Sequence, residues 1–439
     1  MDIADFEFRT PADFIFLRDR LQSRGLEAGG VRDKVLPILE DVRTHGDQAL
    51  VKYTRRFDCP DFSASDLELG PRDMEEAMHR VDTEQLRNIQ EAVERIRSYH
   101  LRQRENSWFD PGADGAMVGQ MNLPVQSAGL YVPGGQGGKT PLVSSLIMTA
   151  VPALVAGVEN ICPVSPPGKN GSLNDYILAT AGVLGLNRIF CCGSAWAIAA
   201  LAWGTETIPR VDVIAGPGNI FVSSAKEMVS GIVGIDMIAG PSEIAILADD
   251  SAHPEWLAAD MLSQAEHDPL AASILVSPEQ RVLDSCRQQL QAQADTLPRR
   301  DIALESLNNC GALIRVPDLE TGLELINMLA PEHFELCVRD PWEMLGRVKN
   351  AGAVFLGHFS PEAAGDYFAG PNHVLPTLFS ARYSSALSVD FFTKKTSIVA
   401  ASREYMREHG DKIAALARLE GLEAHARSAE MRTGKFRES

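Results

Sequence analysis

Residues 128–164 read AGLYVPGGQGGKTPLVSSLIMTAVPALVAGVENICPV. Two short apolar runs, Ala128–Val132 and Asn160–Val164, flank a glycine-rich turn and a longer apolar stretch, Val143–Val158. That longer stretch falls short of the roughly 20 residues needed to span a bilayer, and it indicates a buried helix. Strand, turn, helix and strand in this order form the repeating unit of a parallel sheet. The stretch therefore predicts an α/β fold.

The same alternation continues along the chain in two series separated by helical patterns. The first series of strand-like runs is Ala128–Val132, Asn160–Val164, Arg188–Cys192, Val211–Ala215 and Ile235–Ala239. The second series is Ile244–Ala248, Ser273–Val276, Ala312–Val316, Phe334–Val338 and Ala353–Leu356. A chain of 439 residues is too long for one comfortable core. We therefore expect two tandem Rossmann-like α/β modules with parallel sheets, at residues 127–240 and 241–378, with a binding cleft between lobes.

The two ends of the chain differ from the modules. Helical spacing at Phe14–Arg24, Leu36–Thr44 and Gln85–Arg102 predicts a helical N-terminal region, residues 1–126, that packs on the second module. The pattern loosens after Pro376, and from Arg403 onward the composition is charged and helical with little apolar surface. Residues 379–439 are therefore predicted to form a helical dimerisation tail that reaches a partner subunit.

Composition limits the partners and the compartment. The formal net charge is −18 and the sequence pI is near 5.0, so we expect neither nucleic-acid nor membrane-surface binding. Seven cysteines lie scattered from Cys59 to Cys337 without a Cys-x-x-Cys pair, which is typical of a reducing compartment. The acidic start, Met1–Phe6, lacks the basic and apolar regions of a signal peptide. These features predict a cytoplasmic protein.

Four segments far apart in the chain hold histidines together with carboxylates. They are Ser263–Asp268, Pro331–His333, Gly365–His373 and Glu420–His425. The chain has only ten histidines, so their presence in these segments predicts one polar site assembled by folding. Imidazole and carboxylate together suit zinc or a similar borderline metal.

Each segment taken alone has a second interpretation. A helix predicted at Ser251–Glu266 would place Gln264 and His267 one turn apart as metal ligands, or His267 would only cap the helix end. Asp366 lies in a glycine-flanked turn, where it is a ligand or a turn residue. The adjacent Glu332 and His333 could divide proton transfers or form a solvated loop pair.

Two glycine-rich turns follow strands of the first module, Pro133–Pro141 and Ala215–Asn219. Thr140 as N-cap with Pro141 at the first helical position would offer free backbone donors to a phosphate. Neither turn matches the dinucleotide fingerprint Gly-x-Gly-x-x-Gly, and glycine is common in such turns for backbone reasons alone.

Taken together, these segments resemble the histidinol dehydrogenase family over roughly Val35–Arg427. The motifs that carry the resemblance are GLYVPGG at 129–135, GPGN at 216–219, GIDMIAGPSE at 234–243, SQAEH at 263–267, APEH at 330–333, GDY at 365–367, NHVLP at 372–376 and EGLEAH at 420–425. So many matches in the same order are highly specific.

The resemblance implies a homodimer that oxidises L-histidinol through L-histidinal to L-histidine with two NAD⁺ used in succession. It implies one zinc per site, held by Gln264, His267, Asp366 and, from the partner subunit, His425. In this family the metal binds the imidazole and amino nitrogens of the substrate, so the zinc would orient the substrate.

The resemblance also assigns roles to single residues. His333 would take the alcohol proton, and Glu332 would activate the water that adds to the aldehyde. Substrate contacts would come from Ser242, Gln264, His267, His333, Asp366, His373, Glu420 and His425. Dinucleotide contacts would come from Tyr131 and Asn219.

The chain departs from the family at Trp196, where a glutamine commonly faces the dinucleotide. Tryptophan cannot reproduce the donor and acceptor pair of an amide, so it would stack on the cofactor or only pack. This departure favours one alternative, a related zinc- and NAD-dependent dehydrogenase of another small polar alcohol such as a sulfonated diol. A second alternative is a non-catalytic protein with a structural metal, but no cysteine falls among the expected ligands and both Glu332 and His333 are present.

Overall fold

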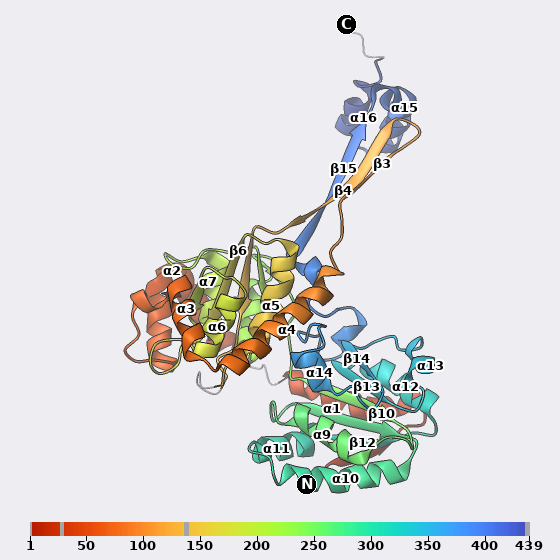
Figure 1. The fold of residues 1–439 in the computed structure, drawn as a ribbon. Helices are drawn as coiled ribbons and strands as arrows, with labels where there is room; N and C mark the ends of the chain where they lie inside the picture. Colours follow the sequence, from red (N-terminus) through yellow and green to blue (C-terminus); the bar gives the residue numbers. More distant parts are fainter. Residues whose placement is uncertain (1, 27–29, 136–139, 435–439) are drawn as a thin grey trace. The chain divides into compact units, whose positions relative to one another are not determined.

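The computed structural model of the chain describes residues 2–26, 30–135 and 140–434, and it separates into two units (Figure 1). The first unit comprises Met1–Gln103 and Gln126–Phe392, and the second comprises Arg104–Val125 and Thr393–Ser439. Among the residues so described, no helix is both long and apolar enough to cross a membrane.

One sheet of the first unit has six strands in the order β2-β7-β6-β5-β8-β9. Its strands are β2 (Glu68–Leu69), β5 (Ser127–Tyr131), β6 (Asn160–Ser165), β7 (Ile189–Cys191), β8 (Val213–Ala215) and β9 (Gly234–Ile235). All neighbours pair in parallel except β2, which runs antiparallel to β7. Helices that pack together in two groups accompany this sheet: α2 (Val31–Phe57), α7 (Ser194–Trp203) and α8 (Ile220–Val229) in one, and α3 (Pro71–Arg80), α4 (Thr83–Leu101), α5 (Val143–Ala156) and α6 (Asp175–Val183) in the other.

The second six-stranded sheet is parallel throughout, in the order β1-β12-β11-β10-β13-β14. Its strands are β1 (Ala4–Glu7), β10 (Glu243–Ala248), β11 (Ala272–Ser277), β12 (Ala312–Arg315), β13 (His333–Cys337) and β14 (Ala353–Leu356). The helices of this module are α1 (Phe14–Leu26), α9 (Pro254–Ala265), α10 (Gln280–Ala294), α11 (Arg300–Cys310), α12 (Leu319–Leu329), α13 (Pro341–Leu345) and α14 (Glu362–Tyr367).

Burial on both faces explains why the central strands of the second sheet are continuous apolar runs. Successive side chains of a strand point to opposite faces. Ala245 and Leu247 of β10 join a core with helices α1 and α12, whereas Ile244 and Ile246 join a core with helices α9, α10 and α11. A parallel strand covered by helices on both sides favours apolar residues at successive positions, which is the pattern at 244–248.

The second unit is a three-stranded antiparallel sheet with two helices. The strands, in the order β15-β4-β3, are β3 (Trp108–Pro111), β4 (Ala116–Pro124) and β15 (Thr393–Ala401), and the helices are α15 (Arg403–Leu419) and α16 (Glu423–Glu430). Its buried apolar cluster is small: Ala414, Ala426 and Ala429. Many larger apolar side chains are instead exposed, among them Trp108, Phe109, Val118, Val399, Leu416 and Leu419.

The predicted fold class is confirmed, and so is the tandem order of strands. The strands that the pattern did not predict are β1, β2, β3 and β4 in the N-terminal region and β15 in the tail. Strand β9 ends at Ile235, well short of the predicted Ala239, because the next residue, Asp236, turns to accept a hydrogen bond from the backbone N–H of Gly216 at 2.8 Å and to pair with Lys226. The boundaries predicted at residues 126, 240 and 378 stay a prediction.

Two predicted helix starts are wrong. Helix α5 begins at Val143 with Leu142 at its N-cap, so Thr140 and Pro141 lie before the helix. Helix α9 begins at Pro254, with His253 in place of Ser251 at its N-cap, and it ends at Ala265.

Candidate active site

Glu332 and His333 stand where strand β13 begins, and both side chains are buried. The neighbouring strand β10 pairs Ile244 with His333, which brings Glu243 alongside them. The backbone N–H of Glu243 donates to Oε2 of Glu332 at 2.9 Å, and its carbonyl oxygen lies 3.2 Å from Nδ1 of His333. A carbonyl oxygen can only accept, so Nδ1 of His333 carries the proton of this bond. In the neutral ring, the lone pair is then on Nε2.

Helix α14 supplies two carboxylates to the same imidazole. Glu362 and Asp366 lie four residues apart and therefore on one face of the helix. Oε1 of Glu362 is 3.6 Å from Nδ1 of His333, and Oδ1 of Asp366 is 3.7 Å from its Nε2. Within the described part of the chain, these three residues form the one group of three or more His, Cys, Asp or Glu donors that lie within 4.8 Å of one another.

Glu362 is a site residue that the sequence interpretation missed. Asp366 was expected in a glycine-flanked turn, and that expectation is wrong because residues 362–367 form a helix. A helix predicted at these residues would have identified Glu362, because a residue four positions before Asp366 lies on the same face of a helix.

Burial and mutual repulsion set the proton affinities of this cluster. Desolvation raises the pKa of Glu332 to about 8 and that of Glu362 to about 7. Burial alone would lower the pKa of His333, but the charges of Glu362 and Glu332 and the contact with Asp366 raise it well above its usual value. Burial also opposes ionisation of Asp366, yet the imidazoles of His333 and His373 lower its pKa. The raised pKa values of Glu332 and Glu362 lie near neutral pH, which suits groups that transfer protons.

The end of helix α9 carries two more predicted residues, Gln264 and His267. Gln264 is buried at 1% exposure, and its Oε1 has no hydrogen-bond partner among the described residues. His267 lies just beyond the helix, is exposed, and its imidazole acts on the pKa of Asp366. An amide oxygen, an imidazole and a carboxylate form a donor set that suits zinc, and the negative end of a helix dipole favours a cation.

His373 and Ser242 lie at the edge of this cluster. Nδ1 of His373 is 3.1 Å from the carbonyl oxygen of Asp366, which ties the segment after α14 to the site. Ser242 directly precedes β10, and its carbonyl oxygen accepts the N–H of Ala272 at 3.0 Å. Its half-buried side chain belongs to the same end of the sheet as Glu332.

The predicted dinucleotide residues lie in the first module. Tyr131 ends strand β5, is buried, and accepts the N–H of Ser194 on its hydroxyl at 3.1 Å. Asn219 is the exposed N-cap of α8, and its Oδ1 accepts the N–H groups of Phe221 and Val222 at 3.1 and 3.2 Å. Its Nδ2 donors stay available for a ligand. Part of the first glycine-rich turn, residues 136–139, lies outside the described residues.

Trp196 packs between two aromatic residues of helix α2. Its ring centroid is 5.8 Å from that of Tyr53 and 5.6 Å from that of Phe57, with interplanar angles of 21° and 18°. Its side chain is 5% exposed, and its Nε1 has no hydrogen-bond partner among the residues described. The indole therefore has little surface left for a cofactor.

Glu420 and His425 belong to the second unit. Glu420 caps the end of α15, His425 lies on α16, and both are exposed. The structure therefore gathers Gln264, His267, Glu332, His333, Asp366 and His373 in the first unit and leaves Glu420 and His425 on the surface of the second.

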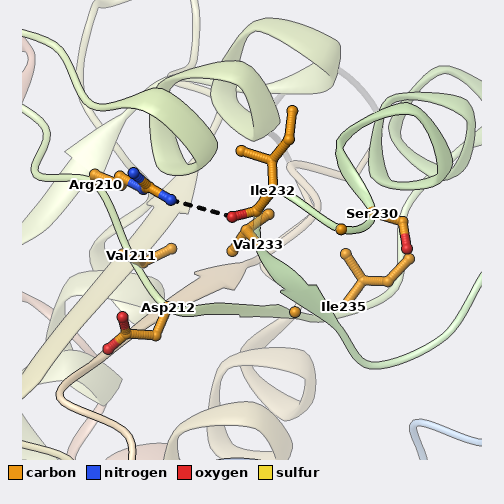
Figure 2. Close-up of a pocket in the computed structure, with 9 residues that line it drawn as sticks. Arg210, Val211, Asp212, Ser230, Ile232, Val233 and Ile235 are labelled. Atoms are coloured by element: carbon orange, nitrogen blue, oxygen red, sulfur yellow. Dashed lines mark hydrogen bonds between the residues drawn. The ribbon is translucent and has the colours of Figure 1, made fainter. Parts of the chain in front are cut away.

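Figure 2 shows a pocket elsewhere, at the β8 and β9 edge of the first module. It is lined by Arg210, Val211, Asp212 and residues 230–235, and Arg210 donates across it to the carbonyl oxygen of Ile232 at 3.2 Å. None of the predicted site residues lines it.

Two sheets of mostly parallel strands and a buried imidazole–carboxylate cluster define an α/β protein with the acid–base groups of an enzyme. A family model described as histidinol dehydrogenase matches residues 21–433. The chain is 56% identical over 425 residues to a histidinol dehydrogenase of Oleidesulfovibrio alaskensis, covering 97% of this chain and 98% of that protein. It is 54% identical over 427 residues to one of Nitratidesulfovibrio vulgaris, with the same coverage. The crystal structure of a histidinol dehydrogenase from Elizabethkingia anophelis matches with a TM-score of 0.90 at 34% identity over 98% of each chain.

The chain therefore belongs to the histidinol dehydrogenase family, a family of oxidoreductases. The family predicted from the motifs is confirmed.

Proposed function

We propose that this protein oxidises L-histidinol through L-histidinal to L-histidine and reduces two NAD⁺ in succession. The observation that carries the proposal is the buried pair of Glu332 and His333, in which His333 donates through Nδ1 and leaves Nε2 toward Asp366. A base and a carboxylate side by side can carry out two proton transfers at one site. The match to the histidinol dehydrogenase family over nearly the whole chain supports the assignment of these transfers to a dehydrogenase.

In the first oxidation, Nε2 of His333 accepts the hydroxyl proton of histidinol as the C–H bond breaks and hydride passes to NAD⁺. The products are the aldehyde, NADH and one proton held on His333. The carbonyl oxygen of Glu243 supports this role because it fixes which ring nitrogen is protonated. Glu362, 3.6 Å from Nδ1, stabilises the imidazolium that forms.

In the second oxidation, Glu332 takes a proton from water as the water oxygen adds to the aldehyde carbon. The anion of the hydrate would then lose hydride to a second NAD⁺ and its remaining hydroxyl proton to the site, which gives the carboxylate. A pKa of about 8, raised by burial, makes the Glu332 carboxylate a stronger base than an ordinary glutamate. Its Oε2 is held by the N–H of Glu243 at 2.9 Å. Both oxidations at one site avoid release of a reactive aldehyde.

Zinc is the proposed metal, with Gln264, His267, Asp366 and His425 of the partner subunit as its ligands. The unpartnered Oε1 of the buried Gln264 supports this set, because a buried amide oxygen without a hydrogen bond is costly unless a ligand satisfies it. When bound, zinc would hold the imidazole and amino nitrogens of the substrate. Ser242, His373 and Glu420 are proposed to complete the substrate contacts, and Tyr131 and Asn219 the NAD contacts.

A homodimer with shared sites is part of the proposal. The second unit supports it, because a three-stranded sheet with a core of three alanines leaves Trp108, Phe109 and Leu419 at 50%, 52% and 83% exposure. Apolar surface of this extent marks an interface. A cytoplasmic location is also proposed, supported by seven cysteines that are all free and buried.

The test counts NADH formed by zinc-loaded protein from a limiting amount of L-histidinol. We expect about two NADH per histidinol, and loss of activity on chelation that zinc restores. His333→Gln is expected to lose the first step, whereas Glu332→Gln is expected to retain oxidation to the aldehyde and stop near one NADH per histidinol. The matched control is Glu320→Gln, an exposed glutamate of helix α12. No NADH from histidinol with zinc bound would reject the proposal, and a panel of small polar alcohols would then identify the substrate.

A further inference from the structure

The strongest unexplained feature of the structure is a buried ion pair behind the catalytic cluster. Arg24 of helix α1 donates from its Nη2 to Oε2 of Glu243 at 2.6 Å, and their side chains are only 2% and 7% exposed. A buried pair of this kind is weak evidence for stability, because desolvation of two charges offsets most of their attraction. The function of this ion pair therefore depends on which groups it holds in place.

Glu243 uses all its polar groups to hold the site. Its backbone N–H and carbonyl oxygen contact Glu332 and His333, as described above. Its Oε1 accepts the N–H of Leu378 at 3.0 Å, and its Oε2 binds Arg24. Leu378 has a left-handed backbone with φ of 51°, which a branched residue rarely adopts. One residue thus links the two proposed proton-transfer residues to a strained turn.

Arg24 makes three hydrogen bonds, one of which goes to Glu243. Its Nε donates to the carbonyl oxygen of Leu21 and its Nη1 to that of Leu270, both at 3.1 Å, while Nη2 binds the carboxylate. Leu21 belongs to α1 and Leu270 lies before β11, so the planar guanidinium joins two elements to the start of β10. A lysine could offer the charge but not this rigid set of donors.

We propose that Arg24 is a positioning residue, which acts through Glu243 to set the geometry of Glu332 and His333. Strand β10 begins at Glu243, so a shift of this residue moves two backbone groups at once. One is the N–H that holds Glu332, and the other is the carbonyl oxygen that selects the tautomer of His333. The inference rests on the proposed function of that pair. It assigns a role in the reaction to helix α1, which contributes no group to the site itself.

The test compares Arg24→Met with Arg24→Lys and with Arg80→Met, which breaks an exposed ion pair to Asp175 as a control. We expect Arg24→Met to lower kcat about 100-fold, as a small misplacement of catalytic groups does, with KM for NAD⁺ and zinc content unchanged. Free guanidinium, below concentrations that unfold the protein, is expected to restore part of kcat in Arg24→Met but not in Arg24→Lys. Arg80→Met is expected to behave as the parent.

A purely structural role would give a different result. The loss of kcat would then follow the unfolded fraction measured by calorimetry, and guanidinium would not restore it, which would overturn the proposal. If Arg24→Met does not fold, the double variant Arg24→Met with Glu243→Gln removes both charges and keeps an acceptor for Leu378. A parental kcat in either variant would also overturn the proposal.

A readout without turnover separates this inference from the proposed function. Nitrogen-15 spectra of labelled histidines report which ring nitrogen of His333 is protonated, with His333→Gln to assign the signal. At a pH above the raised pKa of His333, where the ring is neutral, we expect protonated Nδ1 in the parent and a mixture of tautomers in Arg24→Met. An unchanged tautomer in Arg24→Met would refute the positioning role, whereas inactivity of the parent on histidinol would refute only the proposed function.

Discussion

Nδ1 of His333 lies 3.6 Å from Oε1 of Glu362, a buried carboxylate one helical turn before Asp366. Both charged groups are removed from water, so their interaction is only weakly screened. Glu362 is therefore placed to set the proton affinity of the proposed base, His333.

Glu362→Gln is expected to lower kcat about ten-fold or more, in the range seen when a partner that supports a site residue is removed. It also removes a negative charge that raises the pKa of His333. With that pKa lowered, His333 stays a free base to lower pH, so the acidic limb of the pH profile of kcat/KM is expected to move to lower pH. Glu320→Gln serves again as the matched exposed control. An acidic limb that does not move would contradict this role of Glu362.

Asp58→Asn is expected to stabilise the protein above about pH 6 in the absence of cofactor. Burial raises the pKa of Asp58 to about 6 in the fold, and the carboxylate sits at the negative end of helix α2. Between about pH 4 and 6 the unfolded chain ionises first, so stability falls as pH rises. Above pH 6 the penalty is complete and reaches up to about 3 kcal/mol.

Urea unfolding of the parent and Asp58→Asn at about pH 5 and about pH 8 measures this effect. The gain in unfolding free energy is expected to be larger at the higher pH. The exposed neighbour Asp61, changed to Asn, is the control and should give no gain at either pH. Equal gains at both pH values would show that the charge of Asp58 is not the cause.

Trp196 is expected to act in packing and not in cofactor contact, since its indole is stacked between Tyr53 and Phe57. Trp196→Gln restores the residue type common in the family but removes a large buried ring, and it should lower the unfolding free energy by about 3–5 kcal/mol. Trp196→Phe keeps an aromatic ring and should leave KM for NAD⁺ unchanged. A large rise in KM for NAD⁺ in Trp196→Phe, with stability retained, would show that the indole contacts the cofactor.

The parts of the fold that were predictable share one physical property. Strands covered on both faces, such as β5 and β10, contain continuous apolar runs, at 128–131 and 244–248, and stand out in the sequence. Strands β1, β2 and β15 do not, because they are short edge strands or have mostly exposed residues. Asp366 was assigned to a turn because Gly365 weakens the helical pattern of a helix only six residues long.

The residues of the candidate site also fall into a group that the sequence predicts and a group that it does not. Glu332 and His333 could be named from the sequence because their side chains carry the chemistry and their motif is specific. Glu243 could not be assigned its role, because it holds the pair through backbone atoms that every residue type has. Arg24 lies more than two hundred positions away in the chain from its partner, so no local spacing links the two.

Mixing two inactive variants tests whether sites are shared between subunits. His333→Gln removes the proposed base of the first oxidation, and His425→Asn removes a proposed ligand that lies exposed on α16 of the second unit. In a dimer that exchanges this unit, a mixed dimer has one site with both changes and one site with neither. Random mixing is expected to restore about one quarter of the parental sites, because half of the dimers are mixed and half of their sites are intact.

The measurement is NADH formation from histidinol after the two variants are unfolded and refolded together, or produced together in one cell. Each variant treated alone is the control, and each should stay at background. If His425 acts within its own subunit, every site in the mixture carries one of the two changes, and no activity returns. The recovered fraction thus decides between a ligand supplied in trans and one supplied in cis, independently of how fast the parental enzyme turns over.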